Sequence, residues 1–174
     1  DITYEKLIEV IYDARKLGIK NVKLCGAGEP TENIRFFQFV RDMTRMDIGV
    51  AVFTKGQVLG SDKESKRFNN RYGIKTAEQL CRELYNYKVS FMLGFQSFDT
   101  EVQDNIVGKE GHSLIRNKAL ENLVIAGFNN TNPTRLAICN APLTQTSYND
   151  AFNIYTYARE RGIYQILSLS MTSG

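Results

Sequence analysis

Two kinds of hydrophobic pattern follow one another along this chain. In residues 3–17 the apolar positions recur at steps of three and four, which predicts an amphipathic helix. Thr3 and Gly18 flank this segment and are residue types typical of helix N-terminal and C-terminal caps. Residues 21–25 form a short, mostly apolar segment, which predicts a strand. The apolar face of the helix consists of Tyr4, Leu7, Ile8, Ile11, Ala14 and Leu17.

This pairing of a helix with a following strand repeats along the chain. The later strands are apolar at consecutive rather than alternating positions, which is typical of strands covered on both faces. We therefore expect a parallel sheet with helical crossovers. Helices are expected at 3–17, 32–46, 75–86, 113–126 and 148–161, and strands at 21–25, 48–54, 88–95, 134–139 and 164–169.

Two architectures fit this order: a doubly wound open sheet, or part of a (β/α) barrel. A complete eight-stranded barrel takes about 250 residues, and the 174 residues of this chain exclude it. The chain begins with an amphipathic helix, which in a barrel would pack on a strand before it. We therefore expect that a preceding strand and loop are missing from this sequence.

Composition narrows the classes of function. No run of about 18 apolar residues predicts a membrane-spanning helix. Three widely spaced cysteines do not indicate a disulfide framework, so we expect a reducing compartment, the cytoplasm. A net charge of +3 does not by itself indicate a nucleic-acid partner. With one histidine and no clustered cysteines, no metal site follows from familiar spacings.

Residues 56–74 form a polar insert that is longer than most connections in α/β folds. One interpretation is a lid or substrate-facing segment. The other is a solvated surface helix, which Ser61 is suited to cap. The basic residues concerned are Lys63, Lys66, Arg67 and Arg71.

The ends of the predicted strands differ from the turns that lead into them. Ligands of parallel α/β folds bind at the carboxyl ends of the strands. All five strand ends are polar, small or glycine-bearing, whereas the helix-to-strand turns resemble plain caps, so we expect one ligand-binding edge. The strand ends are 25–33, 53–56, 94–99, 139–142 and 168–174.

The loop 26–30, Gly-Ala-Gly-Glu-Pro, is the most specific of these ends. Its two glycines allow positive φ and close approach of the backbone to a ligand. Glu29 places a carboxylate there, and Pro30 suits the start of the next helix. The loop lacks the third glycine of a dinucleotide fingerprint and the Gly-Lys-Ser/Thr of a phosphate-binding P-loop. A tight turn with an exposed glutamate remains the alternative.

Other residues of reactive type have simpler interpretations. Cys25 and Cys139 end strands, and without a partner they are expected to be packing residues. His112 has no nearby nucleophile motif, so no catalytic role is expected. Lys55 follows the second strand, where it is either solvated or an imine-forming lysine.

Taken in order, these segments resemble the radical S-adenosylmethionine superfamily. Residues 26–30 resemble its Gly-Gly-Glu-Pro motif after the second barrel strand, and 53–56 resemble its Thr-Asn-Gly turn after the third. Residues 89–99 with 101–109 resemble the fourth strand and the helices after it, and 134–174 the last two strands. The resemblance implies one α/β domain over the chain, a partial open (β/α) barrel whose parallel sheet has about five strands, the first of six being missing.

The resemblance also implies a site. The loop 26–30 would bind the methionine amino group of S-adenosylmethionine largely through backbone carbonyls, with Glu29 supporting the loop. Thr54 would lie near the methionine end, Gln96 and Ser97 near the ribose or carboxylate, and Asn140 and Leu167 along the adenosine. The cofactor-binding residues so implied are Gly26, Ala27, Gly28, Glu29, Pro30, Thr54, Gln96, Ser97, Asn140 and Leu167.

The implied activity is reductive cleavage of S-adenosylmethionine to a 5′-deoxyadenosyl radical, which takes hydrogen from an unknown substrate: a peptide, nucleotide, sugar or protein. The electron would come from a donor such as ferredoxin or flavodoxin through a 4Fe–4S cluster. The family holds that cluster with a Cys-x3-Cys-x2-Cys loop, which this sequence lacks, and Cys25, Cys81 and Cys139 do not have its spacing. The ligands are therefore expected upstream of Asp1, and the chain as given is expected to be inactive.

Two alternatives from other classes remain open. One is a (β/α)-barrel lyase that forms a Schiff base through Lys55. The other is a binding module that kept the barrel core without a cluster.

Overall fold

The computed structural model describes residues 2–26 and 28–169. Its strands form one five-stranded sheet, in which every neighbouring pair is parallel and the spatial order follows the chain, β1-β2-β3-β4-β5. The strands are β1 (Asn21–Leu24), β2 (Gly49–Thr54), β3 (Ser90–Gly94), β4 (Leu136–Leu143) and β5 (Tyr164–Leu169).

Helices separate the strands along the described chain. The helices predicted from the apolar pattern are confirmed with shifts of a few residues at their ends. Helix α6 was implied only by the resemblance of residues 101–109. The α-helices are α1 (Tyr4–Lys16), α2 (Phe36–Arg45), α3 (Gln57–Gly60), α4 (Asp62–Asn69), α5 (Ala77–Asn86), α6 (Thr100–Val107), α7 (His112–Ile125) and α8 (Ala151–Glu160). Short 3-10 helices occupy Pro30–Glu32, Asn70–Tyr72, Phe128–Asn130 and Tyr148–Asp150.

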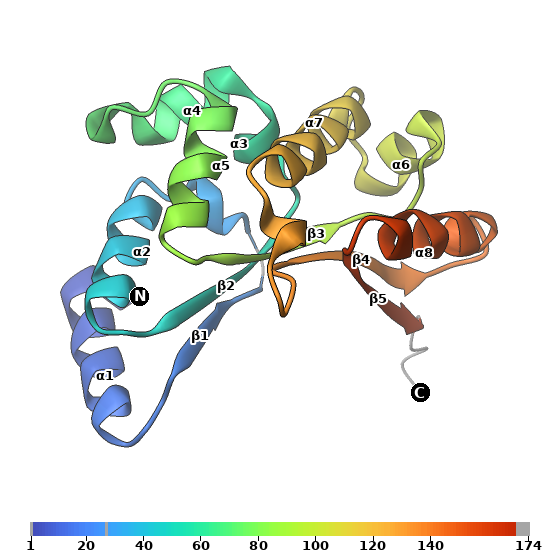
Figure 1. Cartoon of the computed structure of the whole chain (residues 1–174). Helices are drawn as coiled ribbons and strands as arrows, with labels where there is room; N and C mark the ends of the chain where they lie inside the picture. Colours follow the sequence, from blue (N-terminus) through green and yellow to red (C-terminus); the bar gives the residue numbers. More distant parts are fainter. Residues whose placement is uncertain (1, 27, 170–174) are drawn as a thin grey trace.

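The strand order decides between the two architectures. Crossovers between parallel strands are right-handed, so five strands laid down in one direction place every crossover helix on the same face of the sheet. Figure 1 shows this arrangement: the helices gather on one side of a curved sheet, and the other side is open. A doubly wound sheet would reverse its direction and have helices on both faces. The fold is therefore α/β with an open, partial (β/α)-barrel architecture.

The expectation that the strands are covered on both faces was wrong. Along β2, Val50 and Val52 are buried, whereas Ala51 and Phe53, which alternate with them, are half-buried. Alternation arises because successive side chains of a strand point to opposite faces, and only one face is packed against helices. The open face carries small or apolar residues as well, so its sequence hides the period of two. By their register these include Ala51, Phe53, Met92, Ala137 and Cys139.

The 56–74 insert forms α3, α4 and a 3-10 turn within the helical layer. Val58 and Leu59 of α3 are fully buried, and α3 packs against α7. Gly60 permits this close approach, because a Cβ there would lie 1.9 Å from the Ile115 carbonyl oxygen. Ser61 caps α4 by accepting a hydrogen bond from the Glu64 amide, as predicted. The insert therefore joins the core through α3, and only α4 is a polar surface helix.

Among the residues described, no helix combines the length and apolar character needed to cross a membrane.

Candidate functional site

All five strands deliver their carboxyl ends to the same edge of the sheet, because the sheet is entirely parallel. The loop after β1 and the end of β2 lie at this edge. So do the turn after β3 and the carboxyl half of β4.

Glu29 ties the loop after β1 to the end of β2. Its Oε1 accepts hydrogen bonds from the Thr31 amide at 3.2 Å, the Thr31 hydroxyl at 2.7 Å and the Thr54 hydroxyl at 2.7 Å. Its Oε2 accepts one from the Lys55 amide at 2.7 Å. Thr31 and Thr54 are fully buried. With four donors the carboxylate is satisfied internally, so Glu29 fixes the loop rather than offering itself to a cation.

The glycines of this loop are required by backbone conformation and not by crowding. Gly26 has φ of 140° and Gly28 has φ of 110°, values that side-chain-bearing residues rarely adopt. An added Cβ at either position would meet no atom within 4 Å. The backbone here is therefore open to a ligand. Ala27 lies outside the described residues, and Pro30 begins the 3-10 turn that leads to α2.

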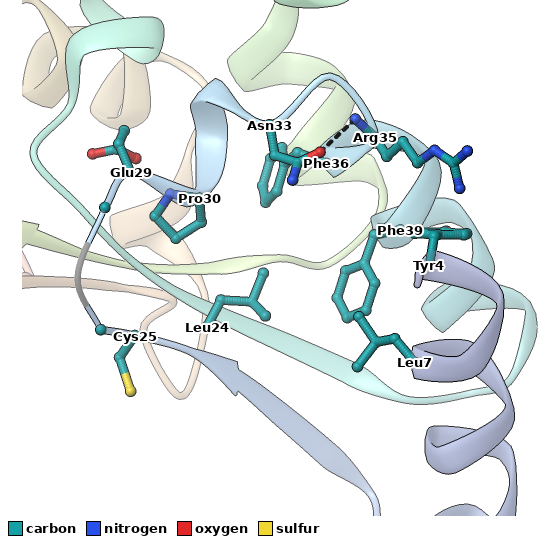
Figure 2. A pocket seen from close by; sticks show the side chains of 12 residues that line it. Tyr4, Leu7, Leu24, Cys25, Glu29, Pro30, Asn33, Arg35, Phe36 and Phe39 are labelled. Atoms are coloured by element: carbon teal, nitrogen blue, oxygen red, sulfur yellow. Dashed lines mark hydrogen bonds between the residues drawn. The ribbon is translucent and has the colours of Figure 1, made fainter. Parts of the chain in front are cut away.

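A cavity of about 320 Å³ lies between this loop, α1 and α2. Figure 2 shows Leu24 and Phe39 pointing into it, whereas the sulfur of Cys25 points away. Small-molecule sites typically begin at about 300 Å³. Its walls are largely apolar; the lining residues are Tyr4, Leu7, Leu24, Cys25, Gly26, Gly28, Glu29, Pro30, Asn33, Arg35, Phe36 and Phe39.

A network of hydrogen bonds from Gln103 and Arg116 supports the turn after β3, and the sequence did not indicate it. Gln103 Oε1 accepts hydrogen bonds from the amides of Gln96 at 3.0 Å and Ser97 at 3.2 Å, and its Nε2 donates to Gln96 Oε1 at 2.8 Å. Arg116 donates to Gln103 Oε1 at 2.7 Å and to the Ser97 carbonyl at 2.9 Å, and its guanidinium lies 3.4 Å from the Phe95 ring centroid. Burial lowers the pKa of Arg116 to about 9.

The polar side chains at the ends of β3 and β4 differ in whether they already have hydrogen-bond partners. The Ser97 hydroxyl donates to the Asp150 carboxylate and accepts from the Asp99 amide, so it is already engaged. Gln96 Nε2 donates to the Ala141 carbonyl at 3.4 Å. Asn140 is fully buried, yet neither its amide nitrogen nor its oxygen has a partner among the described residues. Buried polar atoms are nearly always hydrogen-bonded, so an unpartnered amide is a candidate ligand contact.

The predicted site residues thus fall into two groups and an outlier. The loop 26–30 and Thr54 are joined directly by Glu29. Gln96 and Ser97 are joined to each other by Gln103, and Gln96 reaches β4 next to Asn140. Leu167 of β5 pairs in register with Asn140 of β4, but Leu167 is 52% exposed.

The cysteines of the described chain do not form a metal centre. No group of three histidine, cysteine, aspartate or glutamate side chains among the described residues is close enough to hold a metal ion. Cys81 is buried in the core, which raises the pKa of its thiol to about 12. Cys25 is exposed at the end of β1, and Cys139 lies on β4. The cysteines of the described residues therefore do not fit the ligand set of a 4Fe–4S cluster.

Lys55 lies exposed after β2, and among the described residues it forms a hydrogen bond only through its backbone amide, to Glu29. Imine-forming lysines are commonly desolvated, and this exposed ammonium keeps its hydration. No observation of the structure therefore favours the Schiff-base lyase.

Comparison of the chain with protein families and with curated proteins finds no match in either.

Proposed function

We propose that this chain is the core of a radical S-adenosylmethionine enzyme and binds S-adenosylmethionine at the carboxyl edge of the sheet. The observation that carries the proposal is the Glu29 network. It pins a glycine loop with accessible backbone to the end of β2, as a loop that receives the methionine ammonium requires. The sequential parallel sheet supports the proposal because it brings the other candidate contacts to the same edge.

Each predicted residue then has a role that its surroundings permit. The carbonyls of the glycine loop accept hydrogen bonds from the methionine ammonium, and Thr54 stabilises the loop through Glu29. Gln96 contacts the ribose or carboxylate of S-adenosylmethionine. The Ser97 hydroxyl already bonds Asp150, so the role of Ser97 is to position Gln96. Within the described residues, Asn140 keeps both a free donor and a free acceptor for the adenosine.

The proposed reaction is cleavage of the sulfonium to a 5′-deoxyadenosyl radical, followed by hydrogen abstraction from a substrate. A 4Fe–4S cluster would supply the one electron that this cleavage needs. The described residues do not supply its ligands, so the chain by itself is proposed to bind S-adenosylmethionine without cleaving it. Ferredoxin or flavodoxin is the proposed electron donor, and the cytoplasm the proposed compartment. The open face of the sheet leaves room for a large substrate (Figure 1).

The test uses the native-length protein, reconstituted anaerobically with iron and sulfide and then reduced. We expect 5′-deoxyadenosine to form from S-adenosylmethionine. Glu29→Gln replaces one accepting oxygen with an NH₂ group, which cannot accept the hydrogen bonds that hold the loop. We therefore expect product formation to fall by at least about tenfold. Glu32→Gln removes the same charge three residues away, where the carboxylate accepts no hydrogen bond from the described residues, and serves as the control.

Two results would contradict the proposal. One is a reconstituted wild type that forms no 5′-deoxyadenosine. The other is equal activity of the Glu29→Gln and Glu32→Gln variants when both are folded, as judged by urea unfolding.

A further inference from the structure

Three polar side chains in successive contact lie beside the end of β2. Gln57 begins α3, directly after the turn that follows β2, and His112 begins α7. Both are buried, with 8% and 2% of their surface exposed. Lys109 Nζ donates to Gln57 Oε1 at 3.0 Å, and Gln57 Nε2 lies 2.5 Å from His112 Nδ1. Neither the glycine-loop network nor the turn after β3 uses this chain of contacts.

The order of these contacts determines where the imidazole carries its proton. An ammonium only donates, so the atom of Gln57 that faces Lys109 is its oxygen. The atom that faces His112 is then the amide nitrogen, which also only donates. Nδ1 must therefore accept, and a neutral ring carries its hydrogen on Nε2. No hydrogen bond to Nε2 forms within the described residues.

Burial keeps this ring neutral. It lowers the pKa of His112, and the positive charges of Arg116, Lys109 and Lys55 lower it further, while Asp104 opposes them. Lys55 and Lys109 are both exposed, and both are close enough to act on the ring. His112 is thus a neutral donor beside two cations.

Two carboxylates near these cations are held by hydrogen bonds from neutral groups and not by the lysine ammonium groups. Glu29 accepts four hydrogen bonds from its own loop and the end of β2. Asp104 accepts from the amides of Gly111 at 2.6 Å and Ser113 at 2.7 Å at the start of α7. Within the described residues the Lys55 ammonium makes no ion pair. The ion pairs of the described residues do not include Lys109 either, so both ammonium groups remain available to an anionic group at this part of the carboxyl edge.

We propose that Lys55, Lys109 and the Nε2 hydrogen of His112 form a binding site for an anionic group, a phosphate or carboxylate, of a molecule bound at the carboxyl edge. An anion there receives hydrogen bonds from two ammonium groups and from a donor held in one tautomer, and it relieves the repulsion between the cations. The proposal shares an edge with the S-adenosylmethionine site and goes beyond it. The anionic group belongs either to the substrate or to the carboxylate of S-adenosylmethionine itself.

The sole histidine of the chain provides the readout. In a long-range ¹H–¹⁵N NMR spectrum of the full chain, we expect one imidazole with its hydrogen on Nε2. Inorganic phosphate at constant ionic strength should shift it saturably. Lys55→Met and Lys109→Met should each lower the affinity for phosphate at least about tenfold, since each removes a charged hydrogen-bond donor. Lys63→Met on the exposed surface of α4 is the matched control and should bind as wild type.

A His112 signal that phosphate leaves unmoved overturns the proposal, as does a shift that both lysine variants retain in full. A hydrogen on Nδ1 overturns the part assigned to His112. Any of these results leaves binding of S-adenosylmethionine to the native-length protein intact, so the two proposals fail separately.

A second arm identifies the source of the anion. Competition between phosphate and S-adenosylmethionine for the shift assigns the site to the carboxylate of S-adenosylmethionine. Independent binding of both assigns it to the substrate. A phosphate shift in a native-length protein that does not bind S-adenosylmethionine supports the anion site and contradicts the proposed function.

Discussion

Single side chains at the carboxyl edge show how differently the sequence reports on structure and on chemistry. The glycine loop could be predicted because Gly26, Gly28 and Glu29 are unusual residues at a strand end. Gln103 and Arg116 could not, because each is one polar residue among many on a predicted helix. The role of Arg116 exists only once the turn after β3 lies over α7 and its carbonyl needs a donor. Sequence indicates local backbone demands, whereas buried polar networks depend on which elements meet.

His112 carries a prediction at this scale. Its pKa is lowered from the ordinary value of 6.5, so below that pH the unfolded chain binds a proton that the folded chain does not. The free energy of unfolding should therefore fall as the pH drops from 6.5 through the folded-state pKa, and rise again as pH increases. We expect His112→Gln to flatten this dependence in urea unfolding between pH 5 and 7. An unchanged slope in the variant would contradict a neutral, buried ring.

At the scale of elements, the helices were easier to predict than the faces of the strands. The first helix has a regular apolar period and Thr3 at its N-cap, and the structure confirms both. The strands were assigned to a sheet covered on both sides because the open face is also apolar, as Phe53 and Met92 illustrate. The apolar pattern did not indicate helix α6, which only the resemblance implied, because residues 100–107 are mostly polar and have no continuous apolar stripe.

The crossing of α3 and α7 gives a prediction for an element contact. Gly60→Ala places a methyl group 1.9 Å from the Ile115 carbonyl oxygen, so the two helices must separate. We expect a loss of about 1–3 kcal/mol in the free energy of unfolding, the range typical of overpacked cores. Gly94→Ala is the matched control, since its Cβ would meet atoms only at 3.7 Å and beyond. Equal stability of the two variants in urea unfolding would show that α3 does not pack as described.

At the scale of the whole molecule, one geometric rule determines the arrangement of the site. Five parallel strands in chain order place all crossover helices on one face and all carboxyl ends at one edge. The order of helices and strands could be predicted from the hydrophobic pattern. The choice of an open barrel over a doubly wound sheet came only from the resemblance, and the structure confirms it. That choice depends on which strands pair, and pairing between distant segments leaves no local signal. It is this choice that leaves one face of the sheet open (Figure 1).

The most direct test is a crystal structure of the native-length protein grown anaerobically with S-adenosylmethionine. We expect the ligand at the carboxyl edge, with its ammonium on the backbone of the loop that contains Gly26 and Gly28, and its adenosine within hydrogen-bonding reach of Asn140. Ligand at the amino ends of the strands, or no bound ligand at saturating concentration, would contradict the proposed site.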